Sequence, residues 1–422
     1  MNSWTDTLDT DLLDDVRIID CDSHLTEPTD LWTSRVPASL ADQVPVQKTV
    51  DGKTAWFLNG EGWASIGGNT IGTGRKKHLG THMVQPFEDV DRAAWSVDER
   101  LALLDEVGIW AQILYPNGIG FSSNHVFAIE DEAQRLMVLQ TYNDFLVDTQ
   151  DASGGRLLPQ AMLPFWDMSL TVKEMTRLLD RGIKGFTISD KPEMIGLPEL
   201  PEPFFAPMWD LFNESGAVAN FHIGSGSRRE DVEAARASSS APRGGLPPQE
   251  GGRPIPAVAP TTWRTFGPQR GFAAMASQMY MSNVRIIVNL CMSDLFDRYP
   301  KLQVVSAESG IGWIPFILEA MEFQLDEMVS LPEEVGHQQR RPTDYFRDHL
   351  YVMFWFEQNA PEKLIEDIGV GNVLIETDIP HPTCLYPEPR RHFSKVLGDL
   401  TPETRRRVLQ DNAAELYGVT FA

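Results

Sequence analysis

The chain has 422 residues, of which 42% are hydrophobic, and its formal net charge is −24. This length suits one large α/β domain with insertions or two ordinary domains, and the composition is that of a soluble globular protein with a sizeable core. The acidic balance argues against nucleic acid or an anionic membrane surface as the main partner. It stays compatible with a bound cation, because a few carboxylates can converge on a metal ion whatever the global charge.

The sequence carries few signals of cellular compartment. Its cysteines, Cys21, Cys291 and Cys384, are spaced for neither a zinc knuckle nor a disulfide framework, which favours a reducing compartment. Residues 1–16 lack the basic and apolar regions of a signal peptide. No apolar run approaches the roughly 18 residues that suggest a membrane span. We therefore expect a cytoplasmic protein without a membrane partner.

Short apolar runs alternate along the chain with amphipathic helical stretches. The runs are apolar on both faces, as parallel strands are when helices cover both sides of their sheet. The predicted strands are residues 17–20, 111–116, 157–164, 183–189, 218–224, 302–308, 350–356 and 373–380.

Several helical stretches have readable ends. Ser96 is predicted as an N-cap, with Glu99 completing a capping box and Gly108 at the exit of that helix. The C-terminal stretch begins at Thr401 and closes on Gly418.

Eight strands alternating with helices predict an α/β fold, a distorted (β/α)₈ TIM barrel in a single domain over residues 1–422. An open, doubly wound sheet remains the alternative. Two segments interrupt the alternation. Residues 45–95 are predicted to be a β-hairpin and loop inserted after the first strand, and residues 225–268, rich in Pro, Gly and Ser, a long loop inserted after the fifth. The long loop is predicted to be either a lid or a solvated insertion.

Polar side chains gather where several of the predicted strands end. The first strand delivers Asp22 and His24, two positions apart, with Glu27 shortly after them. In a barrel the carboxyl ends of all strands meet at one mouth, so groups from distant strands come together there. The other groups at strand ends are His222 from strand five, Glu308 from strand six, and Asp378 and His381 from strand eight.

Each of these residues alone has an ordinary structural explanation. A single histidine at a strand end is more often hydrogen-bonded than metal-bound, and a single aspartate before a turn is usually a cap. The combination is harder to explain in this way, because acids and imidazoles are the ligands of hard or borderline divalent metals. Carboxylates left in such a mouth without a cation would be costly. We therefore predict a shared metal site.

Five segments resemble, in this order, the amidohydrolase-related (amidohydrolase 2) family, which includes aminocarboxymuconate-semialdehyde and resorcylate-type decarboxylases. The segments are "DCDSHLTEP", "NFHIG", "ESGIGWIPFILEAME", "ETDIPHP" and "LTPETRRRVLQDNAAELYG". The resemblance covers most of the chain, residues 17–420 apart from the insertions. It implies a distorted (β/α)₈ barrel with one catalytic divalent metal.

The resemblance also implies roles for individual residues. Asp22 and His24 stand at the paired ligand positions of the first strand, and His222 stands at the ligand position of the fifth. Asp378 stands at the eighth-strand aspartate, which binds the metal or handles a proton. His381 would orient Asp378 or meet the substrate.

The sixth strand departs from the family pattern. Glu308 stands where many members have a histidine that assists water activation or binds the substrate. A glutamate can serve as a general base or as a metal ligand. With Glu27 as a further candidate ligand, the site is richer in carboxylate than a mononuclear zinc site requires.

Three functions are compatible with this site. The leading one is a metal-dependent hydrolase or non-oxidative decarboxylase for a small carboxylated or aromatic substrate, with zinc or manganese and with Asp378, Glu308 and His381 as catalytic groups. The second is a nonheme diiron oxygenase, in which two irons are held by His24 and His222 and by the surrounding acids Asp22, Glu27, Glu308 and Asp378. The third is a non-catalytic binding barrel.

The substrate and the partners are the least readable features. Residues 115–125 are predicted to be an active-site loop, because Pro-Asn-Gly breaks regular structure there. Arg228, Arg229 and Arg264 are candidate partners for a substrate carboxylate, although surface arginines are commoner. The family resemblance implies a homodimer or higher homo-oligomer. The apolar helix 313–325 is a candidate interface, and a helix that faces the core explains its composition equally well.

Overall fold

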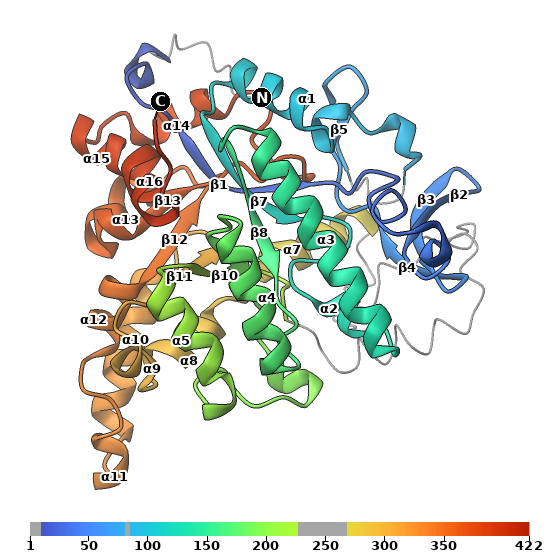
Figure 1. The fold of residues 1–422 in the computed structure, drawn as a ribbon. Helices are drawn as coiled ribbons and strands as arrows, with labels where there is room; N and C mark the ends of the chain where they lie inside the picture. The colour runs from blue at the N-terminus through green and yellow to red at the C-terminus, as the bar shows by residue number, and fades with distance from the viewer. Residues whose placement is uncertain (1–9, 81–84, 227–267, 422) are drawn as a thin grey trace.

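A parallel β-barrel organises the molecule. The computed structural model describes residues 10–80, 85–226 and 268–421. Its main sheet has eight parallel strands in the order β1-β7-β8-β9-β10-β11-β12-β13, nearly closed and surrounded by helices (Figure 1). The strands are β1 (Ile19–Leu25), β7 (Ala111–Pro116), β8 (Leu157–Met162), β9 (Gly185–Thr187), β10 (Val218–His222), β11 (Gln303–Ala307), β12 (Leu350–Phe354) and β13 (Val373–Ile375). The predicted (β/α)₈ barrel is confirmed.

Helices cover the outside of the barrel in Figure 1. The helices in the first half of the chain are α1 (Val97–Val107), α2 (Asn124–Phe127), α3 (Glu132–Ala152), α4 (Met168–Asp180) and α5 (Ala206–Ser215). Those that follow are α7 (Pro268–Met279), α8 (Val284–Cys291), α9 (Leu295–Arg298), α10 (Ile314–Met328), α11 (Pro332–Val335), α12 (Pro342–His349), α13 (Ala360–Ile368), α14 (Pro389–Leu397), α15 (Pro402–Arg406) and α16 (Asn412–Tyr417).

The predicted helix ends are largely present. Gly108 and Gly418 close their helices in the left-handed conformation, and the Thr401 hydroxyl accepts a hydrogen bond from the backbone of the first turn that follows. Ser96 stands at the N-cap of α1, but its side chain makes no capping hydrogen bond. The capping box predicted with Glu99 is therefore wrong.

Strand β1 is longer than predicted, and this changes where the site residues lie. It continues to Leu25, so Asp22 and His24 belong to the strand itself instead of following it. Its pairing with β7 shifts register between Asp20 and Ser23. An irregularity of this kind re-aims the side chains around it, and such features are common beside active sites.

The first insertion is more ordered than the predicted hairpin and loop. It forms a three-stranded antiparallel sheet from β2 (Val46–Val50), β3 (Lys53–Leu58) and β4 (Glu61–Ser65), beside one side of the barrel in Figure 1. A small hairpin of β5 (Ile71–Gly72) and β6 (Lys76–Lys77) follows. Trp56 of this sheet packs edge-on against Trp32, with ring centroids 4.7 Å apart, so aromatic contact fastens the insertion to the body.

Most of the second predicted insertion, with Arg228, Arg229 and Arg264, lies outside the described residues. Helix α10, which covers most of the predicted interface segment 313–325, leaves Phe316 and Phe323 exposed, at 75% and 61%. Oligomerisation itself stays a prediction. In the part of the chain that the structure describes, no helix combines the length and apolar character needed to cross a membrane.

A buried carboxyl group helps to close the barrel between its first and last strands. The backbone joins β1 to the segment after β13 at only a few points, including the His24 amide to the Ile379 carbonyl at 2.7 Å. The Asp20 carboxylate adds to this seam, because it accepts the Thr377 backbone N–H at 2.7 Å, the Thr377 hydroxyl and the Gln112 amide at 2.7 Å. Asp20 of β1 is thus bonded both to β7, through Gln112, and to the segment after β13, through Thr377.

Replacing Asp20 by Ala should destabilise the protein. The change leaves the Thr377 N–H and the Gln112 amide buried without a hydrogen-bond acceptor. This should lower the free energy of unfolding by about 2–4 kcal/mol. Urea denaturation of the variant and of Asp105→Ala measures this. Asp105 is an exposed partner of Arg156, and its loss should cost less than about 1 kcal/mol. Equal losses in the two variants would refute the role given to Asp20.

Candidate metal centre

Two buried histidines, His24 and His222, each direct an unshared electron pair toward the Asp22 carboxylate. Nδ1 of His24 lies 2.9 Å from the Pro116 carbonyl oxygen, and Nδ1 of His222 lies 2.7 Å from the Ile223 carbonyl oxygen. A carbonyl only accepts, so each Nδ1 donates and each neutral ring keeps Nε2 as an acceptor. Neither Nε2 atom has a hydrogen-bond partner within the described residues. A ring fixed through one nitrogen is the usual arrangement of a metal-binding histidine.

Carboxylates face these acceptors. Asp22 directs one oxygen to within 3.5 Å of Nε2 of His24 and the other to within 3.2 Å of Nε2 of His222. A Glu308 oxygen lies 3.1 Å from Nε2 of His222, and an Asp378 oxygen lies 3.5 Å from Nε2 of His24. Acceptors at these distances repel one another unless a proton or a cation lies between them. The donor set therefore fits a divalent metal of hard or borderline character.

The converging ligand atoms form two overlapping groups, and the atoms of each group lie within 4.8 Å of one another. One group contains Asp22, His24, His222 and Glu308, and the other contains His24, Glu308, Asp378 and His381. The fold thus brings together six of the seven predicted site residues from four strand ends.

Glu27, the seventh predicted site residue, is in neither group. Glu27 follows β1, and its carboxylate accepts the backbone N–H groups of Asn117 at 3.2 Å and Gly118 at 2.9 Å. Burial raises the pKa of Glu27 to about 7. Its position makes it an anchor for the loop after β7, which was predicted to border the site.

Burial sets the protonation of the centre. It raises the pKa of Asp22 and of Glu308 well above the ordinary carboxyl range, and the charge of Asp378 adds to both shifts. It also lowers the pKa of His24 well below its ordinary value and that of His222 to about 4. The imidazoles are therefore neutral ligands near pH 7, and the carboxyl groups resist ionisation until a cation joins them.

Glu376 also belongs to the centre but was not predicted. It is fully buried in the run after β13, where one oxygen accepts the Glu308 backbone N–H at 3.0 Å and the other has no hydrogen-bond partner among the described residues. Burial raises its pKa well above the ordinary value, with Asp22 and Asp378 contributing. The available signal was an acid inside an otherwise apolar run, two positions before Asp378.

Two of the acids occupy strained backbone. Glu308 has φ of 51° and Asp378 has φ of 58°, in the left-handed region that residues with a Cβ rarely adopt. Such conformations cost on the order of 1–3 kcal/mol each and cluster at functional sites. The Asp378 amide donates to the Asp22 carbonyl at 2.9 Å, which helps to hold that turn.

His381 and Glu308 lie nearest the outside of the cluster, each 8% exposed. The His381 ring stacks on His24 with centroids 3.7 Å apart, and its Nδ1 lies 2.6 Å from an Asp378 oxygen. Phe121 covers the histidines from another side, with its centroid 4.0 Å from that of His222. A potential proton carrier and an apolar wall therefore border the metal ligands.

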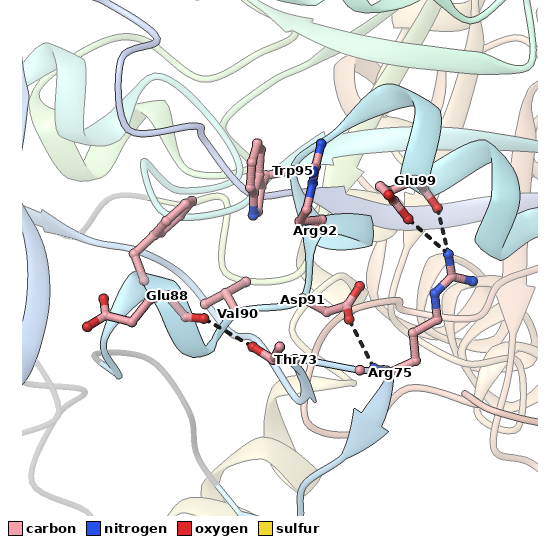
Figure 2. A pocket seen from close by; sticks show the side chains of 10 residues that line it. Thr73, Arg75, Glu88, Val90, Asp91, Arg92, Trp95 and Glu99 are labelled. Atoms are coloured by element: carbon pink, nitrogen blue, oxygen red, sulfur yellow. Dashed lines mark hydrogen bonds and ion pairs between the residues drawn. The ribbon is translucent and has the colours of Figure 1, made fainter.

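A separate surface pocket of about 480 Å³ lies on the inserted segment and the start of α1 (Figure 2). Its lining includes Arg75, Glu99 and Trp95, and Arg75 is already paired with Glu99. None of the predicted site residues lines it. The pocket is therefore distinct from the metal centre.

Several solved structures share this fold. An amidohydrolase from Mycobacterium avium subsp. paratuberculosis superposes with a TM-score of 0.65 at 18% identity, covering 96% of this chain and 98% of that one. A dihydroxybenzoic acid decarboxylase from Polaromonas sp. JS666, with bound manganese and the inhibitor 2-nitroresorcinol, gives 0.57 at 17% identity and the same coverage. A 5-carboxyvanillate decarboxylase from Novosphingobium aromaticivorans, complexed with manganese, gives 0.55 at 16% identity, covering 78% of this chain and 82% of that one.

At these identities the solved structures establish the fold alone. No protein with a curated description matches the chain. The sequence model of the amidohydrolase family, however, matches residues 19–419. That range contains all the ligand candidates and nearly the whole chain. This protein therefore belongs to the amidohydrolase family.

Proposed function

We propose that this chain is a metal-dependent hydrolase or non-oxidative decarboxylase for a small carboxylated or aromatic substrate. One observation carries the proposal: two buried imidazole Nε2 acceptors converge on carboxylate oxygens with no described donor between them. The residues that would hold zinc or manganese are Asp22, His24, His222 and Asp378. When bound, the metal supplies Lewis-acid polarisation of a substrate oxygen or an activated water.

The remaining groups of the site can move a proton. In a decarboxylation the bond to the carboxyl carbon breaks, CO₂ leaves, and the electron pair stays on the other carbon, which must take up a proton. His381 and Asp378, in contact at 2.6 Å near the mouth, are placed to deliver it. In a hydrolysis the same pair, or Glu308, accepts a proton from the attacking water. The burial of these groups strengthens each interaction by excluding solvent.

The choice of first substrates draws on proteins of the same fold. The dihydroxybenzoate and carboxyvanillate enzymes act on substituted aromatic acids and were solved with manganese. Phe121, whose ring lies against His222, offers an apolar face that suits such a ring. Hydroxylated aromatic acids with Mn²⁺ are therefore the first substrates to assay, by release of CO₂.

A second candidate, a two-metal oxygenase with iron, has one specific observation in its favour. Asp22, Glu308, Glu376 and Asp378 crowd one buried site. Burial raises the pKa of Asp22, Glu308 and Glu376, and the charge of Asp378 raises all three further. One divalent ion would leave an excess of negative charge when all four are ionised, whereas two would balance it. Both ligand groups contain the Glu308 carboxylate, whose two oxygens could serve two ions, whereas His24 has a single free nitrogen and could serve only one of them.

Removing a histidine ligand should remove the metal. His24→Ala and His222→Ala are each expected to lower metal content, measured by elemental analysis, from at least one ion per chain to below about 0.2, because each loses an Nε2 ligand. His349→Ala is the matched control. That ring is also buried and bonded through Nδ1 to a carbonyl, at Leu302, but it stacks on Phe296 away from the site. Full metal content in both ligand variants would contradict the assignment.

Removing the metal should make stability fall with rising pH. Above the ordinary histidine pKa of 6.5, the carboxyl groups of the unfolded chain are fully ionised, while Asp22 and Glu308 in the folded metal-free site still hold protons. The folded state then binds more protons than the unfolded state, so its stability decreases as pH rises. Thermal melting of chelator-treated protein between about pH 7 and 8.5 should show this decline.

The metal-loaded protein is the control for that series. A bound cation favours the ionised carboxylates, so its melting temperature should vary less over the same range. If the melting temperatures of the metal-free and metal-loaded proteins changed equally with pH, these carboxyl groups would not be linked to metal binding.

Glu308→Gln separates the two candidate functions. With one metal held by the other ligands, the variant keeps its metal and loses rate, by about 10²–10⁴-fold for a lost proton-transfer group. With two metals, it loses about one ion per chain, and activity in the parent protein consumes oxygen. Elemental analysis and an oxygen electrode distinguish these outcomes. One zinc or manganese and no oxygen uptake support the leading proposal.

A further inference from the structure

The His381 ring lies between the Asp378 carboxyl group and the Asn117 amide. Its Nδ1 faces Asp378, and its Nε2 lies 3.3 Å from the side-chain oxygen of Asn117. Which nitrogen must carry a hydrogen depends on the orientation of the Asn117 amide. That orientation follows from a chain of buried hydrogen bonds that starts in the inserted segment.

The chain begins at Asn69. Its amide nitrogen donates to the carbonyl oxygens of Ile66 and Gly67, both at 3.2 Å. Carbonyls only accept, so the other Asn69 atom must be the oxygen. The Thr26 hydroxyl lies 2.7 Å from that oxygen and donates to it, which uses the one hydroxyl hydrogen of Thr26.

The direction is then transmitted to Asn117. Because the Thr26 hydroxyl already donates its hydrogen to Asn69, its oxygen can only accept, and it does so from the Asn117 amide nitrogen at 2.8 Å. That nitrogen also donates to the Gly68 carbonyl at 3.1 Å, so both of its hydrogens are used. The Asn117 oxygen therefore faces His381 and has to accept a hydrogen from Nε2.

We infer that Asn69, Thr26 and Asn117 are positioning residues that fix the hydrogen of His381 on Nε2 and so present Nδ1 to Asp378 and the metal centre. The inserted segment is thereby part of the active site. The consequence for metal binding rests on the proposed function. The direction of the hydrogen bonds does not, because it follows from donors and acceptors alone.

Two glycines of the inserted segment make this approach possible. A Cβ on Gly67, which has φ of +78°, would lie 1.8 Å from the Asn117 oxygen. A Cβ on Gly68 would lie 2.8 Å from Cδ2 of His381, and Gly68 has no left-handed φ that would strain another residue. Gly68→Ala is therefore a steric probe that displaces the His381 ring without removing a polar group.

The first test is a spectrum of the metal-free protein. A two-bond ¹H–¹⁵N correlation of histidine-labelled protein, with His381 assigned from His381→Gln, should show a hydrogen on Nε2, whether the ring is neutral or cationic. In Asn117→Leu, which removes the acceptor, this signature should shift. A neutral His381 with its hydrogen on Nδ1 in the parent protein would overturn the inference, as would an unchanged spectrum in Asn117→Leu.

The second test is Mn²⁺ binding followed by electron paramagnetic resonance. Asn117→Leu and Gly68→Ala should each raise the Kd by about 10–100-fold, the effect of losing a residue that orients a ligand. Gly371→Ala is the matched control, since a Cβ there meets nothing within 4 Å. Parent-like affinity in both variants would overturn the link to the metal. A parent protein that binds neither Mn²⁺ nor Zn²⁺ would contradict the proposed function, and the spectrum alone would then test the hydrogen-bond chain.

Discussion

The centre of this protein is governed by a mismatch of hydrogen-bonding groups. His24 and His222 each donate the Nδ1 hydrogen to a backbone carbonyl, and the free Nε2 of each ring faces a carboxylate. Buried acceptors that face one another raise the free energy of the folded state unless something positive joins them. A divalent cation relieves this cost for every group at once, whereas single protons relieve it pair by pair. A bound divalent cation would thus account for all the ligand groups of the site.

The barrel delivers these groups through its first and last strands. Asp20 ties β1 to the segment after β13, so Asp22 and Asp378 approach from chain positions more than 350 residues apart. The left-handed backbone at Glu308 and Asp378 is a local cost that the surrounding hydrogen bonds sustain. The inserted segment adds the support behind His381. The candidate ligands, the strained backbone at Glu308 and Asp378, and the inserted segment are therefore in direct contact with one another.

The sequence predicted the barrel well because its strands are apolar on both faces, a pattern that burial under helices demands. It also predicted which acids and histidines converge, since strand ends share one mouth. It did not reveal that the Glu27 carboxylate accepts the backbone N–H groups of Asn117 and Gly118, because those partners come from a distant loop. It missed Glu376, which looks like a strand residue, and it treated Asn117 only as a breaker of regular structure. Those roles depend on partners from distant segments, such as Gly68 and Glu308, that no local pattern reveals.

The most direct test of the central claim is anomalous diffraction from crystals of the protein loaded with Mn²⁺ or Zn²⁺. The account predicts a peak within about 2.0–2.3 Å of Nε2 of both His24 and His222, with Asp22 among the nearest oxygens. If the ion also contacts Glu308 and a second peak lies about 3.5–4 Å away, the two-metal form is present. A map with no peak between the two histidines, at full metal loading elsewhere, would contradict the account.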